Sequence, residues 1–427
     1  AVIAAAASVL VALFPAGAGA GPAAVDAVLL AVALVDLALA VPPSSVGVTR
    51  EIPGVVALGE PAEVVLRIRN PAERRLRVAV ADELAPSLGA PRRRVSVVVP
   101  PAGRVTARLP ILPSRRGRFA IDELAVRVEG PLGLAARQQR RRLPGVLRVY
   151  PPFTSRDEAE LRINRARILE VGLRSAQGLG GGTEFESLRG YAVDDEFRRI
   201  DWPATARSGA PVVRTYRAER NQTVLLLLDA GRVMAGRVAG VPRLDHAMDA
   251  VMMLTAVTTR LGDRAGLVAF DREVRAVVPP GHSRGQLARV TDAMYRLEPA
   301  LVESDYQGAF VETLARFRRR SLLVLFSELS EQAVGDTLLP ALPLVVRDHL
   351  VVVASASDPE VLGWARRPPA AAAGAYRAAA AVAALEERRR VTARLRGIGV
   401  TVVDQPPGRL APALADAYLK VKATGRL

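Results

Sequence analysis

Residues 178–229 read GLGGGTEFESLRGYAVDDEFRRIDWPATARSGAPVVRTYRAERNQTVLLLLD, and this stretch decides the fold. It opens with glycines, continues through closely spaced acids and arginines, and ends in an apolar run at residues 223–228 that delivers Asp229 at its carboxyl end. A short run that is apolar throughout is typical of a strand buried on both faces of a parallel sheet. The run therefore predicts the first strand of an α/β domain, and the charged residues before it are the candidates for function.

Strand and helix patterns alternate along the rest of the chain, from residue 222 to residue 427. Strands are predicted at residues 265–270, 274–278, 322–326, 350–354 and 400–403, and helices at residues 243–261, 284–297, 306–319, 338–346, 371–396 and 411–421. The strands are near-continuous runs of valine and leucine, as buried parallel strands are. We therefore predict a doubly wound α/β domain over residues 222–427, a fold in which ligands bind at the carboxyl ends of the strands.

The segment before it, residues 46–150, shows short alternating runs such as EVVLRIR at residues 63–69. Proline, glycine and asparagine separate these runs, and PPAG at residues 100–103 is typical of a turn. The pattern predicts a β-sandwich-like domain with an interaction or spacer role. Residues 151–221 follow as a charged linker helix and, from residue 178, a charged stretch that we call the signature segment.

The first 41 residues are apolar and predict a transmembrane helical hairpin. Residues 1–14 and 23–41 form two apolar runs, joined by a linker of mostly alanine and glycine. The second run is long enough to cross a bilayer, which takes about 20 residues. Asp26 and Asp36 lie inside it, and we expect Asp36, near one end, at the membrane interface. A signal peptide is the alternative, because AGAGA at residues 16–20 resembles a cleavage site.

Charge and cysteine content limit the partners and the chemistry. The formal net charge is +16, which suits nucleic acid or an anionic membrane surface. The arginine runs lack the interleaved aromatic residues that stack on bases, so we expect no nucleic-acid partner. The loop between the two apolar runs carries no charge, whereas arginine is frequent from Arg50 onward, so the positive-inside rule predicts a cytoplasmic body. The chain has no cysteine, which excludes disulfides and thiolate metal sites.

The order of residues in the signature segment resembles the motif of the bacterial domain-of-unknown-function 58 family, T/G-E-F-x-x-L-R-x-Y followed by G-D-D-x-R-x-I-D-W and A-R. The matching residues are Thr183, Glu184, Phe185, Leu188, Arg189, Tyr191, Asp194, Asp195, Arg198, Ile200, Asp201, Trp202, Ala206 and Arg207. One departure is Ala192-Val193, where the family usually has Pro-Gly. The resemblance implies a membrane hairpin, a β-rich segment, a von Willebrand factor A-like domain, a bacterial inner-membrane location and a MoxR-type AAA+ ATPase as partner.

The charged residues of the signature segment have two interpretations. In the first, arginines pair with Glu184, Asp194, Asp195 and Asp201 to fix a long irregular segment against the α/β domain, with Phe185, Tyr191 and Trp202 as apolar anchors. In the second, some of these groups are unpaired and form a recognition surface. Catalysis by the carboxylates is the third possibility, although no nucleophile or base is visibly placed beside them.

Asp229, at the carboxyl end of the first predicted strand, is a candidate ligand for a divalent cation. The von Willebrand A fold often binds a divalent cation through Asp-x-Ser-x-Ser after the first strand, a Thr and a later Asp, and such oxygen ligands suit Mg or Mn. The corresponding residues here are Asp229, Ser304 with Asp305, and Glu328, while both serine positions are lost and Arg232 adds positive charge. We therefore expect no cofactor, and Asp229 to be a structural carboxylate bonded to neighbouring amides or to Arg232.

Residues 281–285, GHSRG, fit the G-x-S-x-G pattern of serine hydrolases. Because Pro279-Pro280 interrupts the approach to this turn, we expect Ser283 to cap the next helix instead. The function that the sequence favours is a non-enzymatic, membrane-anchored scaffold or adaptor that works with an AAA+ ATPase in the assembly or maturation of envelope or other complexes. The alternative is a metal-dependent binding protein or hydrolase at the inner membrane.

Overall fold

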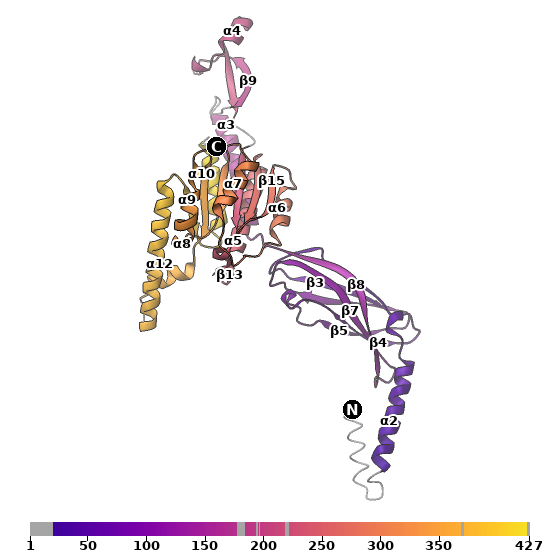
Figure 1. Cartoon of the computed structure of the whole chain (residues 1–427). Coiled ribbons are helices and arrows are strands. Elements are labelled where there is room, and N and C mark those ends of the chain that lie inside the picture. Colours follow the sequence, from indigo (N-terminus) through magenta and orange to yellow (C-terminus); the bar gives the residue numbers. More distant parts are fainter. Residues whose placement is uncertain are drawn as a thin grey trace. The chain divides into compact units, whose positions relative to one another are not determined.

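The computed structural model describes residues 20–176, 184–193, 195, 197–217, 222–368 and 371–424 of the chain. The chain divides into two compact units, residues 1–150 and residues 151–427. The first apolar run, residues 1–14, lies outside the described residues, as do the glycine loop at residues 178–182 and Asp194. Figure 1 shows both units coloured along the sequence.

The first unit begins with α2 (Ala20–Leu39), the helix predicted from the second apolar run. Within the described residues, one helical stretch, Val25–Ser45, is long and apolar enough to cross a membrane. Of the predicted hairpin, the structure therefore describes one apolar helix. A short 3-10 turn, η2 (Pro43–Ser45), leads from this helix into the first strand.

Two sheets follow α2 and share one hydrophobic core. Antiparallel strands form the three-stranded sheet: β1 (Gly47–Glu51), β3 (Ala62–Arg69) and β6 (Arg104–Ile111). The five-stranded sheet has the order β2 (Val55–Ala57), β8 (Ala136–Tyr150), β7 (Gly117–Glu129), β4 (Leu76–Asp82) and β5 (Arg94–Val99). Alternate residues of both sheets, such as Leu66 and Val126, are fully buried in the same cluster. The sheets thus pack through the apolar faces that the alternating pattern predicted.

A buried ion pair joins the two sheets. Arg50 of β1 donates to the carboxylate of Asp82 at the end of β4, and also to the carbonyls of Ile121 and Leu143. Both charged side chains are almost completely buried. Arg50 is the first arginine of the basic part of the sequence, and its charge is balanced inside the protein.

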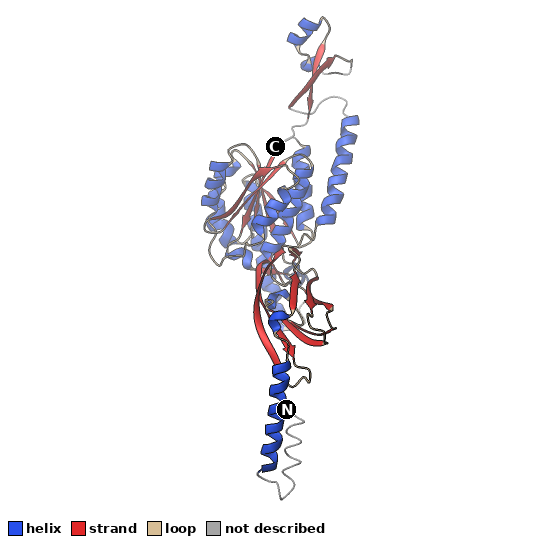
Figure 2. Ribbon diagram, turned by 90° about the vertical axis from the view of Figure 1, so that its right-hand side faces the viewer, coloured by secondary structure: helices blue, strands red, loops and turns tan. Residues whose placement is uncertain are grey.

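The second unit is built on a six-stranded sheet (Figure 2). The strand order is β15 (Val274–Gly281), β14 (Arg264–Phe270), β11 (Thr223–Asp229), β16 (Leu322–Phe326), β17 (Leu350–Ala356) and β18 (Thr401–Gln405). Five of these strands run parallel, and β15 pairs antiparallel with β14 at one edge. The predicted α/β domain is therefore confirmed as a mixed α/β structure, with the difference that the edge strand is antiparallel.

Helices cover both faces of this sheet. Val224, Leu226 and Leu228 of β11 point into one core cluster, and Leu225 and Leu227 into the other. The first cluster is closed by α3 (Arg156–Ala176), α5 (Arg243–Arg260), α6 (Gln286–Met294) and α13 (Leu410–Ala423). The second is closed by α7 (Tyr306–Arg316), η6 (Val334–Leu338), α9 (Leu339–Ala341), α10 (Pro343–Val346) and α12 (Ala372–Gly397). A strand buried on both faces explains why its sequence is apolar without alternation.

Several elements differ from the sequence-based expectation. The helix expected at residues 338–346 is a series of short turns that begins with α8 (Glu331–Ala333), and α11 (Pro359–Arg366) was not predicted. Three further small elements are η5 (Arg232–Ala235), β12 (Arg237–Val238) and β13 (Val241–Pro242). In the first unit the additional 3-10 turn is η3 (Pro86–Leu88).

The signature segment is regular where an irregular segment was expected. Strands β9 (Glu184–Gly190) and β10 (Val212–Arg217) pair antiparallel, with a shift of register near Thr215. The connection between them contains η4 (Phe197–Arg199) and α4 (Trp202–Ser208). Ile200 also forms an isolated bridge with Val213. The segment is therefore a hairpin whose long connection folds back on the second strand.

Candidate functional site

Asp229 ends β11 and is fully buried. The strand is apolar up to this residue, so the sheet itself carries the carboxylate into the interior at the edge where parallel strands end. Burial raises the pKa of Asp229, whereas hydrogen bonds from Ser304, Gly231, Ser327 and Tyr306 act in the opposite direction. A carboxylate in this position needs partners, because an unpaired buried charge is strongly unfavourable.

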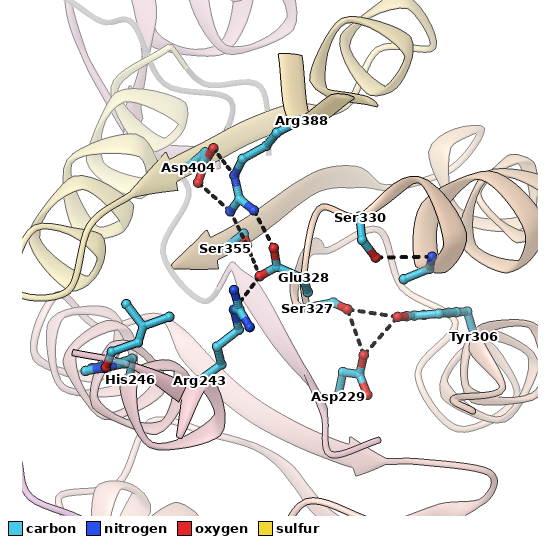
Figure 3. A network of polar contacts seen from close by, with 12 residues as sticks. Asp229, Arg243, His246, Tyr306, Ser327, Glu328, Ser330, Ser355, Arg388 and Asp404 are labelled. Carbon is cyan, nitrogen blue, oxygen red and sulfur yellow. Dashed lines mark hydrogen bonds and ion pairs between the residues drawn. The ribbon is translucent and has the colours of Figure 1, made fainter. Parts of the chain in front are cut away.

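Four donors surround Asp229, and Figure 3 shows two of them, Tyr306 and Ser327. Its Oδ1 accepts from the Gly231 amide at 2.8 Å and the Ser304 hydroxyl at 2.5 Å. Its Oδ2 accepts from the Tyr306 hydroxyl at 2.8 Å and the Ser327 hydroxyl at 2.7 Å. Burial and the nearby carboxylate raise the pKa of Tyr306 far above its usual range, so its proton stays in this network. Asp229 therefore ties together the loop after β11, the start of α7 and the end of β16.

The residues around Asp229 do not fit a bound cation. Gly231 and Val233 stand at the two serine positions of the expected motif. A Cβ at residue 231 would lie 2.0 Å from Ser304 Oγ and 3.0 Å from Val302 O, so a serine ligand has no room there. The carboxylate oxygens are engaged by hydroxyl and amide donors, which face the same lone pairs that a metal would need.

The other predicted ligands point elsewhere. Asp305 is exposed and caps α7, accepting from the Gly308 amide at 2.9 Å. Glu328 pairs with Arg243 at 2.8 Å and also with Arg388. Of the four residues Asp229, Ser304, Asp305 and Glu328, the structure thus brings together the first two. No group of three or more His, Asp or Glu residues suited to a metal occurs among the residues that the structure describes.

Arg232 was expected as an alternative partner of Asp229, and this expectation was wrong. Its guanidinium pairs with Glu303 on the surface. The expected bond to a neighbouring amide is present, from Gly231. Tyr306 and Ser327 are the partners that the sequence did not indicate, because hydroxyl residues at these positions belong to no motif.

A second network lies next to the first, at the ends of β16, β17 and β18 (Figure 3). Arg388 of α12 binds both oxygens of Asp404, at 2.6 and 2.8 Å, and the Ser355 hydroxyl at 2.8 Å, and it pairs with Glu328. Burial opposes the charge of Arg388, but the hydrogen bonds and ion pairs with Asp404 and Glu328 raise its pKa above the usual value. Two arginines, Arg243 and Arg388, thus balance two acids at this edge of the sheet.

The space beside these networks is too small for a substrate. The depression lined by Met234, Arg243, Ser327, Ser355 and Leu410, among others, has a volume of about 10 Å³, which is room for about one water molecule. A larger hollow of about 500 Å³ lies between α8 and α12 and is lined by Glu331, Gln332, Glu387, Arg390 and Arg394. Its charged lining contains no hydroxyl or imidazole that could serve as a nucleophile or base.

In the signature segment, two acids are paired with arginines of the same segment. Arg189 of β9 forms a two-point pair with Asp195, at 2.6 and 2.7 Å. Asp201 caps α4 through the Ala204 amide at 3.0 Å and accepts from Arg214 of β10 at 2.7 Å. The hydrogen bond from Arg214 is the main reason that the pKa of Asp201 is lowered. Of the arginine–acid pairs expected from the sequence, the structure shows Arg189 with Asp195, whereas Asp201 pairs with Arg214.

Several further residues of this segment are exposed. Phe197 and Trp202 are 68% and 57% exposed, and their rings meet edge to face with centroids 5.6 Å apart. Tyr191 is also exposed, and so are Arg198 and Arg207. For Glu184 and Phe185 the structure gives the strand but not the side chain, and Asp194 lies outside the described residues. Tyr191 and Trp202 were expected as buried anchors in one interpretation, and the structure exposes both.

The serine-hydrolase pattern at residues 281–285 connects β15 to α6, but the hydroxyl of its serine contacts an arginine. It follows the antiparallel edge strand β15, and Ser283 Oγ accepts from Arg289 Nη2 at 3.0 Å. The expectation that Ser283 caps the next helix was wrong, because α6 begins at Gln286 with Gly285 at the cap position. The backbone carbonyl of Ser283 instead accepts from the Gln286 amide.

Comparison with known proteins shows which family part of the chain matches. Residues 187–362 match the family described as "Protein of unknown function DUF58". Uncharacterized protein Rv1480 of Mycobacterium tuberculosis and Uncharacterized protein Mb1516 of Mycobacterium bovis are each 28% identical to this chain over 151 residues, which is 35% of this chain. The match covers 48% of each relative, so the chain spans about half the length of these curated relatives. Residues 187–362 thus carry the domain that defines the DUF58 family, which confirms the resemblance drawn from the motif.

Proposed function

We propose that this protein is a non-enzymatic, membrane-anchored scaffold whose signature segment is a recognition surface for a protein partner. The α/β domain is, in this proposal, a von Willebrand factor A-like domain that has lost its cation site. The strand order, the antiparallel edge strand and the position of Asp229 at the end of β11 support that assignment.

The exposed aromatic residues of the signature segment are the observation that carries the proposal. Phe197 and Trp202 expose most of their ring surface, and Val193 is almost completely exposed. Among the described acids nearby, Asp195 and Asp201 are paired with Arg189 and Arg214. A surface that combines exposed aromatic rings with satisfied charges is typical of the centre of a protein interface, where tryptophan, tyrosine and arginine contribute most.

The closed site at Asp229 supports a role other than catalysis. Its carboxylate is buried and accepts four hydrogen bonds, so it offers no free lone pair to a substrate or a metal. A general base must reach its substrate, and the adjacent depression holds about one water molecule. The sheet edge therefore serves as a rigid support for the domain.

The apolar helix α2 supports a membrane anchor. Val28, Leu30, Leu34, Val35 and Leu39 are all largely exposed along it, which is unfavourable in water and favourable in lipid. We propose the bacterial inner membrane with the body of the protein in the cytoplasm, since the basic residues follow this helix. For the partner we propose a MoxR-type AAA+ ATPase, on the basis of the family resemblance.

Binding to a purified MoxR-type ATPase from the same organism tests this proposal. The full chain in lipid nanodiscs is compared with Phe197→Ser, Trp202→Ser and Arg198→Ala. Interface centres of this kind contribute about 2 kcal/mol or more per residue, so each aromatic variant should weaken binding about 30-fold. Tyr376→Ser, at an exposed aromatic residue of α12, is the matched control and should bind as the unmodified protein does.

The three variants also separate a recognition surface from a structural or catalytic one. Arg198 is exposed and forms no ion pair within the described part of the chain, so its removal should change the free energy of unfolding by about 0.5 kcal/mol or less. Loss of binding at unchanged stability is the expected result. Unchanged binding of all three variants would contradict the recognition surface. A variant that kept both stability and partner but lost a hydrolytic turnover would contradict the non-enzymatic role.

A further inference from the structure

The last turn of α2 is locked to the turn between β7 and β8 by a buried carboxylate. Asp36 is fully buried, and it accepts from the amides of Leu132 at 2.7 Å, Leu134 at 2.8 Å and Ala135 at 2.9 Å. The sequence predicted an interfacial position for this residue, and the structure gives the side chain three partners within the protein. A carboxylate on an apolar helix thus becomes the attachment point of a turn nearly a hundred residues away.

Other contacts fix the same junction. A Cβ at Gly130 would lie 2.3 Å from the Asp36 carboxylate, so the turn can approach the helix because residue 130 is glycine. Arg137 Nε donates to the Leu37 carbonyl at 3.0 Å, and Arg74 donates to the Leu39 carbonyl. These arginines donate to carbonyls in the last turn of the helix and match the negative end of its dipole; the Leu37 carbonyl also accepts from the Ala40 amide. The turn therefore stays beside the end of α2.

The tip of this turn is apolar and exposed. Leu132 and Leu134 are 61% and 54% exposed, in a tight turn where Gly133 has a left-handed conformation. Leu39, at the end of α2, is similarly exposed. Turns between strands are normally polar, and two exposed leucines in one such turn are unfavourable in water. Because the turn is held against the helix end, its leucines extend the apolar surface of the helix.

Arginines surround this apolar tip. Arg74 and Arg137 hold the end of the helix, and Arg77 lies close to Gly133, with its guanidinium 3.4 Å from the position of a Cβ there. Apolar side chains next to arginines match the layered chemistry of a bilayer surface, where acyl chains lie below anionic headgroups.

We propose that the β7–β8 turn, residues 130–135, is a second membrane contact beside α2. Leu132 and Leu134 enter the boundary between headgroups and acyl chains where the helix leaves the bilayer, and the neighbouring arginines contact anionic headgroups. This inference rests on the proposed membrane anchor and adds that the first unit is held at a fixed orientation to the membrane surface. Asp36 is in this view the positioning residue that couples the helix to the turn.

Single spin labels test the proposal, and the absence of cysteine makes them simple to introduce. Leu132→Cys and Leu134→Cys of the full chain carry nitroxides in nanodiscs that contain anionic lipid. Oxygen concentrates in the bilayer and a nickel chelate in water. The ratio of the oxygen collision rate to the nickel collision rate therefore rises with the depth of the label in the bilayer. Leu30→Cys, in the middle of α2, is the reference for the bilayer interior.

Leu112→Cys is the matched control in water. Leu112 is 52% exposed and directly follows β6. The other end of β6, Arg104, lies at the end of the sheet where β1 begins after α2, because Arg104 and Gly47 both pair with Arg69. Leu112 therefore lies about 25 Å along the sheet from the end that is next to α2, at a rise of about 3.3 Å per residue. Thermal unfolding of each labelled variant checks that the fold is intact.

The expected result is a ratio for Leu132 and Leu134 several-fold above that of Leu112 and below that of Leu30. Labels at 132 and 134 that behave like Leu112, while Leu30 reports the bilayer, would overturn the inference and leave the anchor in place. A label at Leu30 that reports water would overturn the membrane anchor itself. Replacing anionic by zwitterionic lipid should lower the ratio at 132 and 134, and an unchanged ratio would contradict the headgroup contacts of the arginines.

Discussion

At the scale of single residues, Asp229 shows how a motif position can be kept while its chemistry changes. The carboxylate is buried among uncharged donors from three loops, so it organises the sheet edge. Without it, the Gly231 amide and the Ser304 hydroxyl would be buried donors without a partner, at a cost of about 1–3 kcal/mol each, and Tyr306 and Ser327 would keep only their contact with each other. The residue is therefore expected to matter for stability.

The first prediction concerns the charge of Asp229. In Asp229→Asn the amide oxygen can accept from Gly231 and Ser304, while the amide nitrogen donates to the hydroxyls of Tyr306 and Ser327, which can rotate to accept. We expect a small change in the free energy of unfolding for Asn and a loss of several kcal/mol for Asp229→Ala, which removes the acceptor of four donors and leaves Tyr306 and Ser327 with only each other. Urea unfolding of both variants measures the difference, and an Asn variant as unstable as Ala would contradict this view.

The pH dependence of the same variant is a second prediction. The pKa of Asp229 is raised in the folded protein, so the folded state holds its proton at a pH where the unfolded chain, with a carboxyl pKa of about 3.9, has lost it. The contribution of this residue to stability is therefore complete below about pH 3.9 and decreases as the pH rises through the folded pKa. Relative to the unmodified protein, Asp229→Asn should gain stability between about pH 4 and neutrality. If the difference in free energy of unfolding between Asp229→Asn and the unmodified protein does not change with pH, the raised pKa of Asp229 is contradicted.

The third prediction concerns magnesium. A cation bound at 100 times its dissociation constant would stabilise the fold by about 2.7 kcal/mol, or roughly 5–10 °C in melting temperature. Because Gly231 leaves no room for a serine ligand and the carboxylate is fully engaged, magnesium should leave the melting temperature unchanged. A clear rise that Asp229→Ala abolishes would show that the site binds a cation after all.

Single residues also mark what the sequence could and could not predict about the site. The strand pattern placed Asp229 at the sheet edge, and the motif position of Ser304 correctly brought it to that carboxylate. Tyr306 and Ser327 were missed because a hydroxyl gains its role from the loop geometry, which leaves no periodic signal. Asp305 was misassigned because an acid before a helix also serves as a cap, and here it caps α7.

At the scale of elements, α12 shows that predicting a helix does not predict which of its side chains are buried. The sequence predicted this helix within one residue at each end, but it did not indicate which of the helix's arginines is buried. Ala381, Val391 and Leu395 are buried, and Arg388 shares their side of the helix because the spacings of three, four and seven residues follow its period. The charge of Arg388 could be interpreted only when its partners Asp404 and Glu328 were known.

Arg388 provides the fourth prediction. In Arg388→Ala two largely buried acids, Glu328 and Asp404, lose a partner, and breaking such pairs costs about 3–5 kcal/mol. Arg389→Ala, one residue along the same helix, is the matched control. Its side chain is exposed and pairs with Glu386, so its loss should change stability by less than about 1 kcal/mol. Equal effects of the two substitutions on urea unfolding would show that the network carries little of the stability.

The signature segment shows the limits of prediction for short elements. Dense charges concealed the strands β9 and β10, and the sequence suggested an irregular segment. The partner of Asp201 is Arg214, on the second strand of the hairpin, so it could not be identified without the pairing of the strands. Residues that the family motif selects, such as Trp202, are exposed here, which a motif cannot reveal.

At the scale of the whole molecule, the chain is two units with separate cores. One cluster serves residues 1–150, and the two clusters on the faces of the six-stranded sheet serve residues 151–427. The boundary at residue 150 coincides with the change from the alternation of a β-rich segment to the strand and helix periods that follow. How the first unit meets the membrane depends on the contacts of α2 with the β7–β8 turn, and these contacts cannot be inferred from composition.

The last prediction concerns topology and separates the membrane anchor from a cleaved signal peptide. The segment between the two apolar runs carries no charge, and arginines begin at Arg50, so the basic side should remain in the cytoplasm. A fluorescent protein fused after Leu427 should therefore fluoresce, and alkaline phosphatase at the same position should be inactive, since it folds only outside the cytoplasm. A signal peptide cut near residue 20 predicts the reverse for both reporters, together with a shorter N-terminus in the mass spectrum. Active phosphatase with α2 retained would instead indicate an inverted anchor, and the recognition surface would then have to meet an extracytoplasmic partner.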